Sequence, residues 1–217
     1  MRVRDELRIS ARRQEQLTRA MEVCLVGVFF IGLDRGNLGI AVNAGVALGV
    51  TFLPAILERD YGIPLDAGLT LWITTAVFLH AVGTLGPYTD ASLWWWDHMT
   101  HALSASLVAA VGYTTTRAID RHTEAIYLPP RFMFVFILLF TVAFGVVWEV
   151  VEFALGGLSS VVGSGSILTQ FGLEDTMKDL MFDTLGGVLV ALWGDAYLND
   201  TVRALTTRLS GGRRGAD

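Results

Sequence analysis

Residues 132–148 read FMFVFILLFTVAFGVVW, an unbroken apolar run without a charged side chain. About 20 mostly apolar residues are needed for a helix to cross the bilayer core. A helix satisfies its backbone hydrogen bonds internally, which lipid requires because no water is present to replace a missing partner. The run therefore predicts a transmembrane helix, which we place at residues 131–154.

Composition extends this conclusion to the whole chain. Hydrophobic residues make up 53% of the 217 residues and charged residues 17%, against roughly 25% charged in soluble domains. A chain this apolar would aggregate in water, so the lipid bilayer is its expected partner. The net charge of −5 lacks the basic excess typical of nucleic-acid binding, and we expect no nucleic-acid partner.

Six segments with the length and hydropathy of a membrane span follow one another along the chain. They cover residues 20–36, 38–57, 67–87, 97–117, 131–154 and 175–197. The predicted fold is therefore all-α, a polytopic transmembrane helix bundle of about six spans that occupies residues 20–198. Basic tails at residues 1–19 and 199–217 flank this bundle.

The positions of Lys and Arg predict the orientation of the bundle. With six spans, the two tails and the loops after spans two and four lie on one side of the membrane. All of the 16 Lys and Arg residues except Arg35 and Lys178 then fall on that side. Because basic loops stay in the cytoplasm, we expect a multi-pass protein of the cell (inner or plasma) membrane with both termini cytoplasmic.

Ionisable residues in and beside spans four to six are the feature that bears most on function. They fall in the motifs WWWDHMTH, WEVVEF and EDTMKDLMFDTLGG, and spacings of three and four place their members on shared helix faces. These members are Asp97 and His101, Glu149 and Glu152, and Asp175, Asp179 and Asp183. Each costs about 2.5–3.5 kcal/mol near the bilayer centre. Since all three motifs lie near the extracytoplasmic ends of their spans, we expect them to share one aqueous cavity.

Carboxylates and imidazoles gathered in this way suit divalent metal ions such as Mg²⁺, Mn²⁺, Zn²⁺ or Fe²⁺. Helix bundles build comparable sites from Glu and Glu-x-x-His on facing helices. Closely spaced carboxylates also suit acid–base catalysis or proton relay. The predicted metal ligands and the predicted catalytic residues are the same six, Asp97, His101, Glu149, Glu152, Asp179 and Asp183. The expected cofactor is a divalent metal ion.

Some of these residues also have simpler interpretations. Asp97 and Asp175 can serve as N-caps of spans four and six, since Asp is favoured at a helix start. Lys178 can simply pair with Glu174 or Asp175. Under these interpretations the outer carboxylates stabilise helix ends, and the site is confined to residues one or more turns inside the spans.

Two further histidines and one loop lie close to these motifs in the sequence. His98 is expected to point away from the face that Asp97 and His101 share and to lie in the membrane interface. His80, near the outer end of span three, is a further candidate for the cavity. The glycine- and serine-rich loop at residues 156–172 contains no Lys or Arg, and we expect it to act as a mobile lid.

The sequence around these motifs resembles the YjdF-type inner-membrane proteins, a family of unknown function. The resemblance rests on LPAILERDYGIPL, WWDHMTHALSASLVAAVGY, WEVVEF and GLEDTMKDLMFDTLGG, and it covers most of the chain after about residue 30. It implies a membrane bundle with a polar site and supplies no established reaction.

A more distant similarity, to VanZ-like membrane proteins known for teicoplanin resistance, lies in the order of the three motifs. That family shows Asp-x-x-x-His, then Glu-x-x-Gln, then Asp-x-x-x-Asn-x-x-Gly. The matching positions here are Asp97 and His101, Glu149, and Asp179 and Gly186, with Glu152 and Asp183 in place of Gln and Asn. Both replacements add negative charge, which favours a cation and weakens any transfer of function from that family.

These observations predict a metal-assisted hydrolase or transferase acting on a lipid-linked or envelope substrate at the outer leaflet. A metal can activate water and polarise a phosphoryl or carbonyl oxygen. The outward site argues against ATP as substrate, and the sequence contains no P-loop, nucleophile elbow or His-rich zinc motif. Two alternatives use the same residues: a proton- or cation-coupled transporter, and a non-catalytic membrane partner whose polar cluster locks helices together. The sequence leaves this choice open.

Overall fold

The computed structural model describes residues 9–123, 125–162, 168 and 171–213. These residues form helices and no strand, so the predicted all-α fold is confirmed. The α-helices are α2 (Ala11–Asp34), α3 (Leu38–Thr51), α4 (Leu53–Tyr61), α5 (Ala67–Gly83), α6 (Trp95–His122), α7 (Pro130–Val162) and α8 (Leu173–Arg213). Two 3-10 helices, η1 (Pro87–Thr89) and η2 (Ala91–Leu93), connect α5 to α6.

Three stretches of the described chain are long and apolar enough to cross a membrane, namely Ala11–Asp34, Leu38–Tyr61 and Pro130–Ser159. Helix α5 is apolar and shorter. Helices α6 and α8 carry ionisable residues in their first turns, which lowers their hydropathy. The chain is therefore a helical membrane protein, and the count of six spans stays a prediction.

The second predicted span is two helices rather than one. Helix α3 ends at Thr51 and α4 begins at Leu53, with Pro54 in the first turn of α4. Proline has no backbone N–H to donate, and its ring clashes with the carbonyl four residues earlier, so it interrupts a helix interior. Gly62 ends α4 with a φ of 58°, a left-handed conformation that glycine adopts without steric cost.

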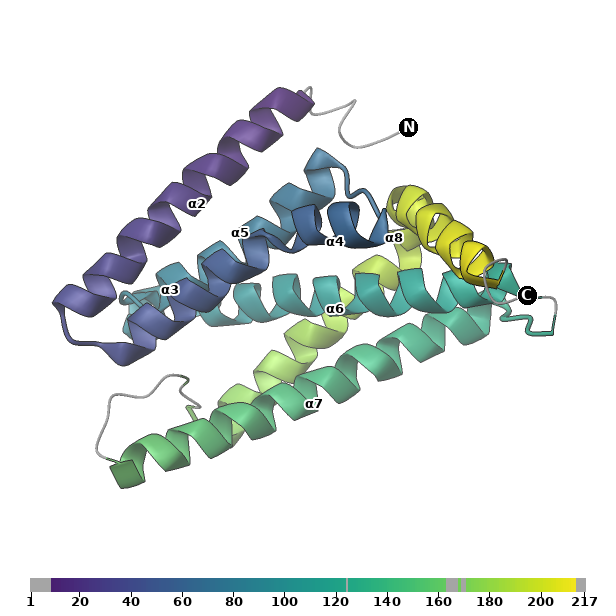
Figure 1. Cartoon of the computed structure of the whole chain (residues 1–217). Helices are drawn as coiled ribbons and strands as arrows, with labels where there is room; N and C mark the ends of the chain where they lie inside the picture. The colour runs from purple at the N-terminus through teal and green to yellow at the C-terminus, as the bar shows by residue number, and fades with distance from the viewer. Residues whose placement is uncertain (1–8, 124, 163–167, 169–170, 214–217) are drawn as a thin grey trace.

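Helix α6 lies at the centre of the bundle between α5 and α7, and α8 crosses it (Figure 1). Helix α8 passes so close to α6 that a Cβ atom on Gly186 would clash with the carbonyl of Ala102 and press on the backbone nitrogen of Ser106. Small residues at such crossings let helix backbones approach closely in lipid. This contact fixes the first half of α8 against α6.

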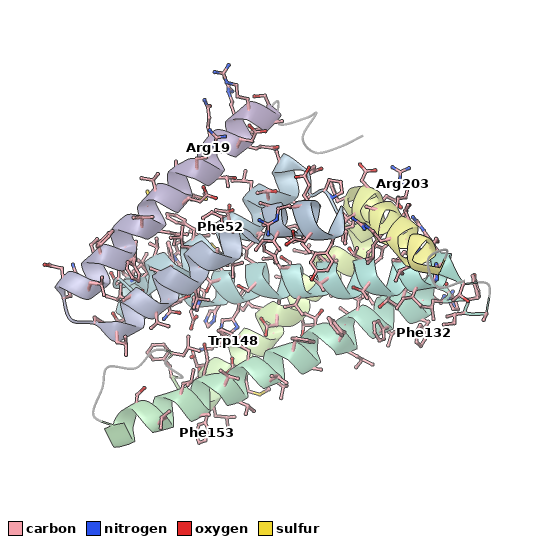
Figure 2. The ribbon with its side chains drawn as sticks, in the orientation of Figure 1. Arg19, Phe52, Phe132, Trp148, Phe153 and Arg203 are labelled. Carbon is pink, nitrogen blue, oxygen red and sulfur yellow. The ribbon has the colours of Figure 1, made fainter. Side chains whose placement is uncertain are left out.

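Large apolar side chains cover the outer surface of the bundle. On α7, Val135, Leu139, Val147 and Phe153 are all more than half exposed. Phe132 and Phe153 point away from the other helices at the two ends of α7 (Figure 2). Soluble proteins rarely expose contiguous apolar patches of this extent, so this surface faces acyl chains.

The helices continue past the apolar segments that predict them. Helix α2 begins at Ala11, where the Ser10 side chain accepts a hydrogen bond from the backbone N–H of Arg13, and α8 continues to Arg213. Helix α8 changes direction between its green first half and its yellow second half (Figure 1). Hydropathy reports only the apolar part of a helix, so the predicted boundaries at residues 20 and 197 omit these polar helix ends.

Candidate functional site

Parts of three helices meet at one end of the bundle: the first turns of α6, the C-terminal half of α7 and the first half of α8. The six predicted side chains lie here together, namely Asp97, His101, Glu149, Glu152, Asp179 and Asp183. All of them except Asp97 are at most 9% exposed. The structure thus brings the predicted residues into one cluster, and their metal-binding and catalytic roles remain predictions.

The imidazole of His101 is the centre of this cluster. Its Nδ1 lies 3.3 Å from Oδ1 of Asp183. Its Nε2 lies 3.8 Å from Oδ1 of Asp97 and 4.0 Å from Oδ2 of Asp179. The two longer distances exceed a direct hydrogen bond, so a small ion or a water fits between these atoms.

Helix α7 supplies two further carboxylates. Glu149, Glu152 and His101 can each place one ligand atom within 4.8 Å of the other two. Oε2 of Glu149 accepts a 2.7 Å hydrogen bond from Oγ1 of Thr176, and Oε1 of Glu152 accepts a 2.9 Å bond from Nε1 of Trp148. Trp148 lies on the side of α7 that faces α6 (Figure 2). Both carboxylates are therefore held in place by hydrogen bonds to one oxygen.

The second oxygen of Glu149 differs from the first. Oε1 of Glu149 is buried and accepts no hydrogen bond within the described part of the chain. A buried polar atom without a partner costs about 1–3 kcal/mol, and more if it is charged. This atom is therefore available to a ligand.

The prediction for His98 is wrong. Its side chain is buried, and its Nδ1 lies 2.9 Å from Oδ1 of Asp179. Its ring stacks on Phe182 of α8, with ring centroids 5.0 Å apart. Because α8 packs along α6, it covers the face of α6 that a single-helix argument assigns to the interface. The His-x-x-His spacing of His98 and His101 was the available signal, since residues three apart share one side of a helix.

The simpler interpretation of the outer carboxylates fits only in part. Asp97 and Asp175 lie in the first turn of α6 and α8, and neither is the N-cap residue. A carboxylate in a first turn interacts favourably with the helix dipole, and Oδ2 of Asp175 accepts a 3.3 Å bond from the backbone N–H of Phe171. Lys178 pairs with Glu174 at 2.7 Å, so this alternative for Lys178 is confirmed.

A strong excess of negative charge marks the site. We use the name polar cluster for Asp97, His98, His101, Glu149, Glu152, Asp179 and Asp183. Among the ion pairs of the described residues, none joins a Lys or Arg to these carboxylates. Buried charge without a partner is costly in protein and in lipid. A bound cation would supply the missing positive charge.

His80 lies beside the polar cluster in a chain of hydrogen bonds. Its Nε2 is 3.1 Å from Oδ1 of Asn43, and its Nδ1 is 2.8 Å from the hydroxyl of Tyr88. That hydroxyl is 3.2 Å from Oγ1 of Thr100. Burial raises the pKa of Tyr88 above its ordinary value, so the hydroxyl stays protonated. Tyr88 and Thr100 were missed because a single Tyr or Thr carries no distinctive spacing.

Two cavities adjoin the polar cluster. The larger has a volume of about 350 Å³, lies among α3, α5, α6 and α7, and is lined mainly by aliphatic and aromatic side chains, with His101 and Asp183 in its wall. The smaller has a volume of about 160 Å³ and is more polar, and Asp97 and Glu152 line it. His80 lines both cavities. Residues of the polar cluster thus line both an apolar cavity and a polar one.

Comparison with known proteins identifies the family. Residues 17–200 match the family described as predicted membrane protein (DUF2238). The chain belongs to this family. An uncharacterized protein of Thermotoga maritima is 26% identical over 177 residues, which cover 80% of this chain and 86% of that protein. No solved structure matches the chain.

The segment that matches DUF2238 contains the whole polar cluster and every residue that lines the two cavities. This agrees with the resemblance to an uncharacterised inner-membrane family. The first part of the loop predicted at residues 156–172 is wrong, because residues 156–162 are the helical end of α7. Residues 163–167 and 169–170 of the predicted lid lie outside the described residues. Of this segment, Leu168 and Phe171 line the smaller cavity, and the lid itself stays a prediction.

Proposed function

We propose that this DUF2238 protein is a metal-dependent hydrolase or transferase acting on a lipid-linked substrate. One observation carries the proposal: residues of the polar cluster line both an apolar cavity of about 350 Å³ and a polar cavity of about 160 Å³. An amphiphilic molecule needs both environments at once, with its polar head and its chain on opposite sides of the bond that joins them. That bond would lie at the polar cluster.

The apolar cavity fits the chain of such a substrate. Val46, Val77, Val108 and Phe144 line it, and ligand pockets with mostly apolar walls and a few convergent polar groups are typical of small-molecule sites. The polar cavity fits the head group. We place this end of the bundle at the outer leaflet of the cell membrane, because the arrangement of Lys and Arg favours cytoplasmic termini.

The proposed chemistry assigns a role to each part of the polar cluster. Asp97, His101 and Asp179 would hold the cation, since each can place a ligand atom within 4.8 Å of the others. The cation would polarise a phosphoryl or carbonyl oxygen and acidify a bound water. Glu152, which lines the polar cavity, would act as the base.

In the reaction, water loses a proton to Glu152 and its oxygen attacks the phosphorus or carbonyl carbon. The bond to the leaving oxygen breaks, and the electron pair stays on that oxygen. Glu152 then returns the proton to the leaving oxygen. In a transferase, an acceptor hydroxyl takes the place of water. Trp148 Nε1, which donates to Oε1 of Glu152, keeps the carboxylate oriented during both proton transfers.

The experiment compares a long-chain and a short-chain phosphate monoester as substrates of the full chain in lipid nanodiscs with Mn²⁺. We expect turnover of the long-chain ester that His101→Ala removes. Val108→Trp, which fills the apolar cavity, should lower kcat/KM for the long-chain ester at least tenfold and leave the short-chain ester unchanged. Val111→Trp is the matched control on the same helix, because Val111 is 64% exposed.

Absence of Mn²⁺-dependent turnover of phosphate and carboxylate esters alike would contradict the hydrolase proposal. An equal effect of Val108→Trp on both chain lengths would contradict the assignment of the apolar cavity.

A second candidate, a proton- or cation-coupled transporter, is favoured by the hydrogen-bonded chain through Asn43, His80, Tyr88 and Thr100. This chain joins four helical elements beside the polar cluster, and such relays are typical of proton pathways. The test is ion flux in proteoliposomes. Flux that His80→Gln and Asp183→Asn both abolish, without any ester turnover by the wild type, would favour the transporter.

A further inference from the structure

We propose that the polar cluster binds two divalent cations, with the carboxylate of Asp179 bridging them. This inference rests on the proposed cation site and specifies its nuclearity. It adds His98 and Asp175 to the set of metal ligands. Paired cations are a common arrangement at sites that cleave phosphate esters.

The two oxygens of Asp179 face different histidines. Oδ1 lies 2.9 Å from Nδ1 of His98, and Oδ2 lies 4.0 Å from Nε2 of His101. Asp179 belongs to two groups of potential ligands, one with His98 and Asp175 and the other with His101 and Asp97. Within each group the ligand atoms lie within 4.8 Å of one another. One carboxylate therefore stands between two possible cation positions.

The spacing of the ligand atoms suits metal coordination. Metal–ligand bonds of about 2.0–2.2 Å place two ligands about 3 Å apart when they are at right angles and about 4.2 Å apart when they are opposite. The distance of 2.9 Å from Asp179 to His98 lies at the lower end of this range, and that of 3.8 Å from Asp97 to His101 lies within it. Little movement would be needed to bind an ion in either position.

A second observation points independently to a ligand. Glu149 is 5% exposed and its Oε1 has no hydrogen-bond partner among the described residues. Glu149 also groups with His101 and Glu152 within 4.8 Å. A cation beside His101 would give this buried oxygen the partner that it lacks.

The second position is held rigidly. The ring of His98 stacks on Phe182 with an angle of 11° between the ring planes. The ring of Trp94 also contacts His98, with the two ring centroids 6.0 Å apart. Asp179 is 1% exposed. Lys178, the nearest cationic residue in sequence, already pairs with Glu174. Among the described residues no Lys or Arg forms an ion pair with Asp179 or Asp175, so a bound cation would add to the positive charge available from His98.

Two bridged cations explain how the site would handle a phosphate ester. In paired sites with ions about 3.5–4 Å apart, one ion activates the attacking water and the other stabilises the leaving oxygen. The proton balance is the one given above, with Glu152 as the base.

The test uses the full chain in nanodiscs, loaded with Mn²⁺ and freed of weakly bound ion. Metal analysis gives the number of ions per chain, and electron paramagnetic resonance reports whether two Mn²⁺ ions are magnetically coupled. We expect two ions with a coupled spectrum in the wild type. His98→Gln and Asp175→Asn should each leave one ion with an uncoupled spectrum. His122→Gln, at the other end of α6, is the matched control and should keep two.

The outcomes separate this inference from the proposed function. One uncoupled ion in the wild type, or two coupled ions in both His98→Gln and Asp175→Asn, would overturn the bridged pair and leave the single-cation site standing. No bound ion in the wild type would overturn both. Asp175→Asn guards against a folding defect in His98→Gln, because Asp175 is only partly buried.

Discussion

The same three helices, α6, α7 and α8, form two unlike halves of the bundle. At one end they enclose the polar cluster, and toward the other end they bury Ala109, Tyr113, Ile137, Val190 and Val202 in an apolar core. The apolar half buries aliphatic and aromatic side chains, whereas the polar half buries carboxylates without a Lys or Arg partner among the described ion pairs. We infer that the apolar half supplies stability and that the polar half is retained for its chemistry.

The largest effect is expected where the two halves meet. Gly186→Val would force a side chain into the carbonyl of Ala102 and separate α8 from α6. We expect a loss of more than about 4 kcal/mol in the free energy of unfolding, a size that indicates a disrupted core. The readout is the loss of monodisperse protein after detergent extraction.

Gly49→Val is the matched control for this change, because nothing lies within 4 Å of a Cβ atom at Gly49. This variant should remain monodisperse. Normal behaviour of both variants would show that the two halves do not depend on the close crossing of α6 and α8.

Within the apolar half, Ile137→Ala should destabilise the protein by an amount in the lower part of the range of about 2–5 kcal/mol seen for buried Ile. Ile137 is 0% exposed, and lipid still solvates the side chain in the unfolded state. Leu139→Ala, at a position 67% exposed, should change little. Thermal unfolding in micelles measures both, and equal effects would contradict the inferred core.

Between the halves, Gly145→Ala tests whether close packing positions the polar cluster. A Cβ atom on Gly145 would clash with Oδ2 of Asp183 and displace that carboxylate from His101. We expect Mn²⁺ affinity to fall about tenfold, or about 1.4 kcal/mol, as measured by isothermal titration calorimetry. Gly27→Ala, where a Cβ atom meets open space, should bind Mn²⁺ as the wild type does.

The smallest change in stability is expected in the polar half. Asp183→Asn removes one of several like charges, so relief of repulsion should offset the lost contact with His101. In metal-free protein the free energy of unfolding should fall by less than it does for Ile137→Ala. A loss comparable to that of Ile137→Ala would mean that the polar cluster serves mainly to hold the helices together.

The sequence predicts the helices well because lipid imposes a simple rule on apolar segments. The run at residues 132–148 needs no partner to be recognised, and it lies within α7. The break at Pro54 follows from proline chemistry and was overlooked because hydropathy continues through it. The N-terminal end of α2 and the C-terminal end of α8 are helical but polar, and hydropathy does not detect polar helix.

The polar cluster is predictable only in part. Helical spacing pairs Asp97 with His101 and Glu149 with Glu152, and topology brings the motifs to one end of the bundle. The position of His98 depends on how α8 crosses α6, which a single-helix argument does not contain. The two cavities also arise from packing between helices, and no local motif specifies them.

The central claim is that the polar cluster is a cation site, and the most direct measurement is the thermal unfolding of the full chain with and without Mn²⁺. A ligand that binds only the folded state adds about 2.7 kcal/mol at a concentration of 100 Kd. We predict a clear rise in the unfolding temperature of the wild type and none for His101→Ala. No rise in the wild type, or an equal rise in both proteins, would contradict the claim.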